Sequence, residues 1–302
     1  MAVNIIHREH RLAGQGAIFL CAVLWSTSGL FIRLVDWHPM TIAGVRSFLA
    51  ALVLLAIRLF FLEKDDNAPG KSEYIKNLAK KSPLLAVCGL CYTATMILFV
   101  AANKLTASAN AIMLQYTAPV WAAILGWLFL RERLFWQHFV ALIFVSAGMY
   151  LVFSGGLVAG SLTGDILALV SGITFAANSV VLRSHKDSNP SDILFFAHVI
   201  CVIISIPFFF LHPPVITMRN SLCIAFMGIF QLGLASALFA YGIKRVSAVQ
   251  SMLTAAIEPV LNPVWVLLAI GEKPAASVIA GGSIIIGAVL FSSILSALRR
   301  RS

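Results

Sequence analysis

Four polar residues in one apolar stretch are the residues of this sequence whose types and spacing best indicate chemistry. Gln250, Thr254, Glu258 and Asn262 follow one another at intervals of four residues, so on a helix they form a stripe on one face. A carboxylate at the centre of a bilayer costs about 2.5–3.5 kcal/mol even on the mildest scale, so it normally faces a partner or a cavity. We expect Glu258 to bind the amino or cationic group of a substrate, or to carry a coupling proton. The alternative is a carboxyl group that is protonated or ion-paired inside the protein and never contacts cargo.

Arg46 is the second charged residue expected inside the membrane. It lies roughly 10 Å along its apolar stretch at 1.5 Å per residue, and Glu258 lies roughly 17 Å from the same face by the same arithmetic. A long arginine side chain nearly spans that difference, so an Arg46–Glu258 ion pair is one prediction. The other prediction is that Arg46 holds a substrate carboxylate, for which the planar guanidinium is well suited. The sequence favours neither.

Further polar and aromatic side chains in apolar stretches are candidates to line a cavity. Hydrogen bonds between helices would explain the same residues. The stronger candidates are Trp25, Ser28, Gln115, Tyr116 and Asn178, and the weaker ones are Tyr92, Thr93, Thr95, Gln231, Ser236 and Tyr241. The lone His198 is more typical of hydrogen-bonded packing than of a proton relay.

Motifs of enzymes and of metal sites are absent from the sequence. There is no HExxH, GxSxG or Walker A motif, and no His/Cys/Asp cluster has metal-ligand spacing. We therefore expect no catalytic residue, no cofactor and no metal. Without a nucleotide-binding loop, we expect any transport to be driven by a gradient.

The composition predicts a membrane protein with many spans. The 302-residue chain is 60% hydrophobic and 11% charged, with a mean hydropathy of +0.93, whereas about a quarter of a soluble domain is charged. About 20 apolar residues cross a bilayer as a helix, which satisfies its own backbone hydrogen bonds. Ten stretches qualify: 14–35, 40–61, 84–102, 107–130, 137–155, 164–183, 192–211, 221–242, 247–270 and 276–297. The predicted fold class is an all-α integral membrane protein with ten transmembrane helices.

The Lys and Arg residues predict how the chain is oriented. With a cytoplasmic N-terminus, nearly all of those outside the spans fall in cytoplasmic segments, and only Lys104, Arg219 and Lys273 fall outside the cell. This bias predicts a cell-membrane protein with both termini in the cytoplasm. The net charge of +10 is thus a topology signal, and we expect no nucleic-acid partner. The expected partners are the lipid bilayer and a small-molecule substrate, with coupling to a proton or another ion.

The two halves of the sequence align with each other. Each half contains five of the ten predicted spans. Because five is an odd number, the second half must be inverted in the membrane relative to the first. We predict repeats at 1–157 and 158–302, with the binding site between them near the midplane. Ser283 and Gly287 in the last span suit close helix contact, within the chain or across a homodimer. The aligned pairs include Lys104 with Lys244, Pro119 with Pro259, Glu132 with Glu272, and Arg33 with Arg183.

The paired proline segments YTAPVWAAILGWLFLRERL and AIEPVLNPVWVLLAIGEKP carry a family resemblance over nearly the whole chain. Each has a glutamate 13 residues after a proline, as in Pro119/Glu132 and Pro259/Glu272. With two halves of five spans, the chain resembles the EamA branch of the drug/metabolite transporter superfamily. The resemblance implies a basket-like bundle with a central cavity, spans five and ten toward the side, and no enzyme activity.

The resemblance also implies a function. Members are secondary transporters that export amino acids or other small metabolites, and the positive clusters expected for phosphorylated cargo are absent here. We therefore expect export of amino acids or related amphiphilic compounds by alternating access. An importer or exchanger of another polar metabolite or drug in the same fold is the alternative, and a membrane enzyme using Glu258 ranks well below both.

Overall fold

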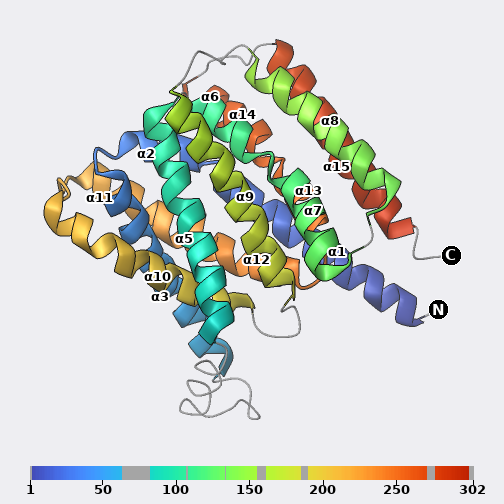
Figure 1. Ribbon diagram of the computed structural model, residues 1–302, viewed down its shortest axis with the longest axis horizontal. Coiled ribbons are helices and arrows are strands. Elements are labelled where there is room, and N and C mark those ends of the chain that lie inside the picture. The colour runs from blue at the N-terminus through green and yellow to red at the C-terminus, as the bar shows by residue number, and fades with distance from the viewer. Residues whose placement is uncertain are drawn as a thin grey trace.

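The computed structural model is helical throughout, with no strand in the residues that it describes (Figure 1). Those residues are 2–62, 82–106, 108–132, 134–154, 161–184, 190–270 and 276–298. In the first half, the helices are α1 (Ala2–Trp25), α2 (Ser28–Leu34), α3 (Pro39–Leu62), α5 (Ser82–Leu105), α6 (Ser108–Gln115), α7 (Ala118–Leu130) and α8 (Trp136–Phe153). In the second half, they are α9 (Leu162–Ser184), α10 (Pro190–Leu211), α11 (Met218–Phe226), the π-helix η1 (Met227–Leu234), α12 (Ala235–Ile243), α13 (Ala248–Ala255), α14 (Glu258–Ile270) and α15 (Ala276–Leu298).

The lengths and hydropathies of these helices confirm an all-α membrane protein. Six stretches are long and apolar enough to cross a bilayer: Pro39–Phe60, Ala86–Asn103, Asn110–Leu130, Leu162–Ser184, Pro190–Leu211 and Met218–Ile243. Four shorter apolar helices accompany them: Leu12–Trp25, Trp136–Val152, Ala248–Leu261 and Ala276–Ser292. The count of ten transmembrane helices, the repeat boundaries and the inversion of the second half stay predictions.

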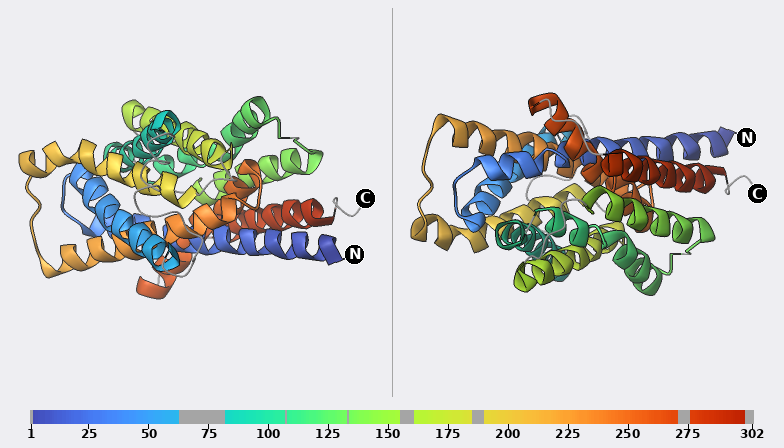
Figure 2. Two further views of the ribbon diagram at one scale, coloured as in Figure 1. Left: turned by 90° about the horizontal axis from the view of Figure 1, so that it is seen from below. Right: turned by 90° about the horizontal axis from the view of Figure 1, so that it is seen from above.

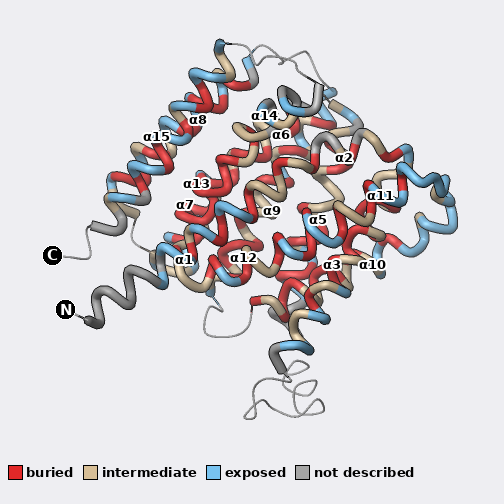
Figure 3. Tube along the Cα trace, turned by 180° about the vertical axis from the view of Figure 1, so that it is seen from behind, coloured by how far each residue is buried: buried red, intermediate tan, exposed pale blue. Residues whose placement is uncertain are grey.

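Helices of the first half pack mainly against helices of the second half. The principal partner of α1 is α12, that of α3 is α10, that of α5 is α9 and that of α8 is α15. Figure 3 shows buried residues along the middle of the bundle and exposed ones on α11 and on the outer sides of α8 and α15. The core of the molecule therefore lies between the two halves of the sequence.

The pair α8 and α15 runs along one edge of the molecule (Figure 1), and α15 ends at the same end of the molecule as the start of α1 (Figure 2). A Cβ atom on Gly148 would lie 2.7 Å from the carbonyl oxygen of Gly281, so only glycine permits this helix–helix approach. At Gly287, which the sequence predicts to make such a contact, a Cβ atom would have no neighbour of the described chain within 4 Å. Within the chain, the close contact of α15 is thus made by Gly281.

Two predicted spans are each divided into two helices just before a proline. Pro119 and Pro259 are the second residues of α7 and α14, and two-residue turns separate these helices from α6 and α13. Because proline has no N–H, the carbonyl groups four residues earlier, of Gln115 and Ala255, lose their helical donors. The Tyr116 hydroxyl lies 3.3 Å from the Ala255 carbonyl and gives it the longer branch of an O–H shared with Glu258.

Two further irregularities occur in spans that carry no proline at the irregular point. The first span breaks at Ser26 and Thr27, between α1 and α2, and the Ser26 hydroxyl accepts a hydrogen bond of 2.7 Å from the Trp265 indole of α14. The span 218–243 contains the π-helix η1, a local widening that is frequent at functional sites. All of these irregular segments border the centre of the bundle.

Candidate functional site: a central cavity

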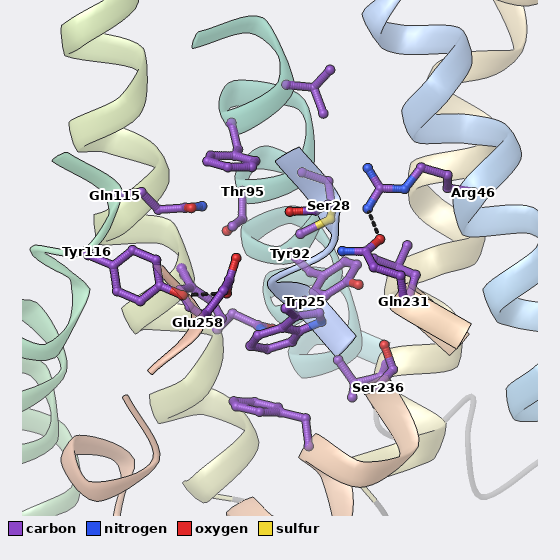
Figure 4. A pocket seen from close by; sticks show the side chains of 18 residues that line it. Trp25, Ser28, Arg46, Tyr92, Thr95, Gln115, Tyr116, Gln231, Ser236 and Glu258 are labelled. Carbon is purple, nitrogen blue, oxygen red and sulfur yellow. Dashed lines mark hydrogen bonds between the residues drawn. The ribbon is translucent and has the colours of Figure 1, made fainter. Parts of the chain in front are cut away.

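A cavity at the centre of the bundle collects most of the residues that the sequence predicts for a site (Figure 4). Its walls come from both halves of the chain, since they include residues of α3, α5, α9, η1 and α12 as well as residues at the helix breaks. The predicted residues that line it are Trp25, Ser28, Arg46, Tyr92, Gln115, Tyr116, Asn178 and Glu258. Other lining residues include Thr95, Phe99, Phe175, Gln231, Ser236 and Phe239.

Glu258 and Tyr116 form the polar wall on one side of the cavity. The Tyr116 hydroxyl donates a short hydrogen bond to the Glu258 carboxylate and also lies within bonding distance of the Ala255 carbonyl. Both side chains are positioned by the helix breaks, since Tyr116 lies in the turn after α6 and Glu258 is the first residue of α14. A carboxylate at the start of a helix is favoured by the unpaired N–H groups and the dipole there.

Arg46 and Gln231 lie on another side of the cavity, away from Glu258 in Figure 4. Arg46 is only 4% exposed, and its Nη2 donates to Oε1 of Gln231 at 2.6 Å. Its Nε has no hydrogen-bond partner in the described part of the chain.

The predicted Arg46–Glu258 ion pair is not formed. The ion pairs between described residues join other side chains, namely Arg58 to Asp192, Arg183 to Glu132 and Arg219 to Asp36. Glu258 is instead held by Tyr116, and Arg46 by the neutral amide of Gln231. The cavity thus contains one cationic and one acidic side chain, and neither makes an ion pair within the described residues.

Gln231 is a weak candidate by sequence because no residue type marks the π-helix that positions it. Close packing brings η1 against α3: a Cβ on Gly228 would lie 2.5 Å from Cβ of Leu49, and one on Gly233 would lie 2.8 Å from Cβ of Val53. The only signal in the sequence is this pair of glycines, which lets the two backbones approach.

Several side chains that line the cavity also form hydrogen bonds between helices. Cavity lining and helix–helix hydrogen bonding, the two interpretations that the sequence leaves open, therefore both apply. Gln115 donates to the Ser171 hydroxyl at 2.8 Å, and the Cys88 thiol donates to Oδ1 of Asn178 at 3.0 Å.

His198 is fully buried and does not line the cavity. Its Nε2 lies 3.2 Å from the Tyr92 hydroxyl and 3.1 Å from the Ser236 hydroxyl. These contacts are hydrogen-bonded packing behind the cavity wall, as expected for a lone histidine in a bundle.

Gln250 and Thr254 lie away from the cavity lining. Because the chain turns at 256–257, Glu258 opens a new helix, and the predicted continuous stripe is broken. The fully buried Gln250 accepts a hydrogen bond of 3.3 Å from Ser292 of α15, and the Thr254 hydroxyl donates to the Gln250 carbonyl at 2.9 Å. The side chain of Asn262 lies outside the described part of the structure.

The ends of α7, α9 and α12 are tied together by an ionic network. Arg183 Nε lies 3.1 Å from Oε1 of Glu132, while its Nη1 donates to the carbonyls of Ile243 and Lys244 at 3.1 and 2.9 Å. Oε2 of Glu132 accepts from the Ala248 amide at 3.3 Å. Ile18, Leu182, Ile243 and Val246 belong to the same packed apolar cluster as Tyr92, which lines the cavity.

A family model described as the EamA-like transporter family matches residues 12–154 and again residues 162–294. The chain belongs to this family. Like the family and the relatives below, the protein is a transporter of the membrane rather than an enzyme, and it acts on a small-molecule substrate within the bilayer.

Similar proteins are found in distant organisms. An uncharacterized transporter of Archaeoglobus fulgidus is 26% identical over 92% of this chain and 96% of its own length. An uncharacterized transporter of Clostridium kluyveri is 25% identical over 90% of this chain and 91% of its own. A solved crystal structure matches 97% of the chain with a TM-score of 0.79 at 19% identity, which shows the shared fold.

Proposed function

We propose that this EamA-family protein is a secondary transporter that exports amino acids or related amphiphilic metabolites. The observation that carries the proposal is the pair of opposite charges, Glu258 and Arg46, that line one cavity without pairing with each other. A molecule with an ammonium group and a carboxylate complements both charges. Desolvating such a molecule is costly unless its charges meet partners, so a cavity of this kind selects for zwitterions.

The rest of the cavity suits an apolar side chain. Trp25 lies with its ring centroid 5.6 Å from that of Phe175 and 5.4 Å from that of Phe239, and all three line the cavity. Aromatic walls with a few well-placed polar groups are typical of small-molecule sites. The proposed cargo therefore combines a zwitterionic head with an apolar body.

Alternating access is the mechanism that we propose for this cargo. The cavity is lined by both halves of the chain, and the Glu132–Arg183 network joins the end of α7 in the first half to α9 and α12 in the second. A transporter with a midplane site between repeats works by rocking the halves about that site. In this scheme, the network must rearrange each time the halves rock.

The proposal is tested in two steps, beginning with the identity of the cargo. Cells with and without the protein are challenged with amino acids and their toxic analogues, and a compound that accumulates less in expressing cells is taken forward. Counterflow of that labelled compound is then measured in proteoliposomes. We expect Glu258→Gln to reduce counterflow at least tenfold, because it removes the carboxylate that meets the ammonium group.

Asp36→Asn is the matched control for loss of a carboxylate, because Asp36 is largely exposed and pairs with Arg219 outside the cavity. This variant should transport like the parent protein. Size-exclusion profiles and melting curves establish that each variant is folded. Counterflow of Glu258→Gln equal to that of the parent for every cargo would remove Glu258 from the mechanism.

A further inference from the structure

We propose that Arg46 and Gln231 form the subsite that binds the carboxylate of the cargo, while Glu258 and Tyr116 take its ammonium group. The inference rests on the proposed transport function and adds the orientation of the cargo in the cavity. It places the acid end against α3 and η1 and the amino end against the start of α14.

Arg46 is a permanent positive charge in a nearly dry site. A guanidinium does not deprotonate in proteins, and the side chain is 4% exposed. No described carboxylate lies within ion-pair distance of it. Burying a cation without a counter-charge is costly, and an anion carried in by the cargo would remove that cost at the moment of binding.

Gln231 orients the guanidinium without neutralising it. Its amide oxygen accepts one Nη2–H at 2.6 Å and so fixes the plane of the Arg46 fork. Because an amide carries no net charge, the positive charge of Arg46 stays available to the cavity that both residues line. A carboxylate at position 231 would have formed an internal ion pair, so glutamine is the side chain that positions Arg46 and still leaves it free to bind an anion.

The close packing of η1 on α3 keeps this arrangement rigid. Gly228 of η1 leaves no room for a Cβ beside Leu49, and Gly233 leaves none beside Val53. Leu49 and Val53 lie about one and two helical turns after Arg46 on α3. A preorganised guanidinium loses little side-chain entropy on binding, which strengthens its preference for a carboxylate.

Binding of three compounds that share one apolar body tests the subsite. L-Leucine has both charged groups, leucinol has only the ammonium group, and 4-methylpentanoate has only the carboxylate. Each is titrated against the purified full-length protein in detergent, with the shift in melting temperature as the readout. We expect L-leucine to bind about 10- to 100-fold more tightly than leucinol, as a charge-assisted hydrogen bond provides.

Arg46→Gln should abolish the preference for L-leucine over leucinol and leave the affinity for leucinol unchanged. Arg58→Gln is the matched control, because it removes an arginine from α3 at a site that does not line the cavity, and it should keep the preference. A preference that persists in Arg46→Gln overturns the inference. So does equal binding of L-leucine and leucinol by the parent protein, or no melting shift with any of the three compounds at millimolar concentration.

Gln231→Glu separates a binding role of Arg46 from a purely structural one. The new carboxylate pairs with Arg46, so the variant should melt at the same or a higher temperature than the parent. If Arg46 binds cargo, this internal carboxylate competes and weakens L-leucine binding about 10-fold or more, while leucinol binding is unchanged. Unaltered L-leucine binding in a folded Gln231→Glu protein would assign Arg46 to structure alone.

The failure of this inference and the failure of the proposed function give different results. Flux of a cargo that bears a carboxylate, if Arg46→Gln does not diminish it, overturns the subsite but leaves the protein a transporter. Absence of protein-dependent flux for every compound tested overturns transport itself.

Discussion

The Tyr116 hydroxyl contacts two hydrogen-bond acceptors that lie at the same helix break. Its hydroxyl contacts the carbonyl of Ala255, which Pro259 has deprived of a helical donor, and the carboxylate of Glu258. Within a bundle, each of these oxygens would be costly to leave without a donor. One phenol group therefore orients the carboxylate of the candidate site and, through the longer branch of the same O–H, partly compensates the break in the helix backbone.

Tyr116→Phe should consequently lower both stability and transport. Loss of a buried donor that leaves its acceptors unsatisfied costs about 1–3 kcal/mol, seen as a lower melting temperature in detergent. Counterflow should fall because Glu258 is no longer oriented. Tyr150→Phe is the control, since Tyr150 is 57% exposed on α8. Equal melting temperatures and equal flux in the two variants would contradict the role given to Tyr116.

At the scale of the elements, the sequence predicts those features that depend on a residue's own type and its immediate neighbours in the chain. Pro119 and Pro259 are visible in the sequence, and they mark where two spans break. Polar side chains are rare in apolar spans, so picking them out also found most of the cavity lining.

The features that could not be predicted depend on packing between distant segments. The stripe through Gln250 and Glu258 assumes an unbroken helix, whereas the turn at 256–257 rotates Glu258 away from that face. The π-helix η1 has no residue signature of its own, so the sequence does not predict the contact of Gln231 with Arg46. The depth estimated along the helix axes places Arg46 near Glu258. The direction in which the Arg46 side chain points around the bundle, which the sequence does not give, determines that its partner is Gln231.

The Glu132–Arg183 network gives a prediction at the scale of elements, because it joins the ends of α7, α9 and α12. A double-mutant cycle with Glu132→Gln and Arg183→Gln should show a coupling free energy of about 0.5–3 kcal/mol in thermal unfolding. The pair is only about one-fifth exposed and shares backbone partners.

The exposed pair Asp36–Arg219 provides the reference cycle for this network. Ion pairs at the surface contribute about 0–1 kcal/mol, so its coupling should be close to zero. If the two cycles give the same value, the Glu132–Arg183 network does not hold the helix ends together.

At the scale of the whole molecule, a pair of histidines connects the start of α3 to the end of α10, and so connects the two halves. The rings of His38 and His212 stack with centroids 4.4 Å apart, and His38 also stacks on Phe208. Burial, and then the neighbouring His212, lower the pKa of His38 below its ordinary value. Among the described side chains near this end, Asp36 and Arg219 are charged and pair with each other.

The stability of the protein should therefore fall in mild acid. An unfolded histidine titrates near pH 6.5, and the folded His38 titrates below that, so the unfolded chain binds more protons in this window. The free energy of unfolding should decrease as the pH falls from about 6.5 through the lower pKa of the folded state. Melting temperatures between about pH 8 and pH 5 measure the effect.

His38→Phe keeps the ring stack and removes the titrating group, so its melting temperature should depend less on pH over the same range. His10→Phe is the comparison for loss of an exposed histidine. A pH dependence as steep in His38→Phe as in the parent protein would show that the acid sensitivity arises elsewhere.

The pairing of helices across the halves has a consequence for assembly. Each of α1, α3, α5 and α8 finds its principal partner in the second half, so a half synthesised alone would leave most of its contact surface uncovered. Two polypeptides cut between Ser154 and Ser161 should accordingly be unstable when produced separately and recover a folded protein when co-expressed. In folding terms, we expect each half to depend on the other as the subunits of an obligate heterodimer do.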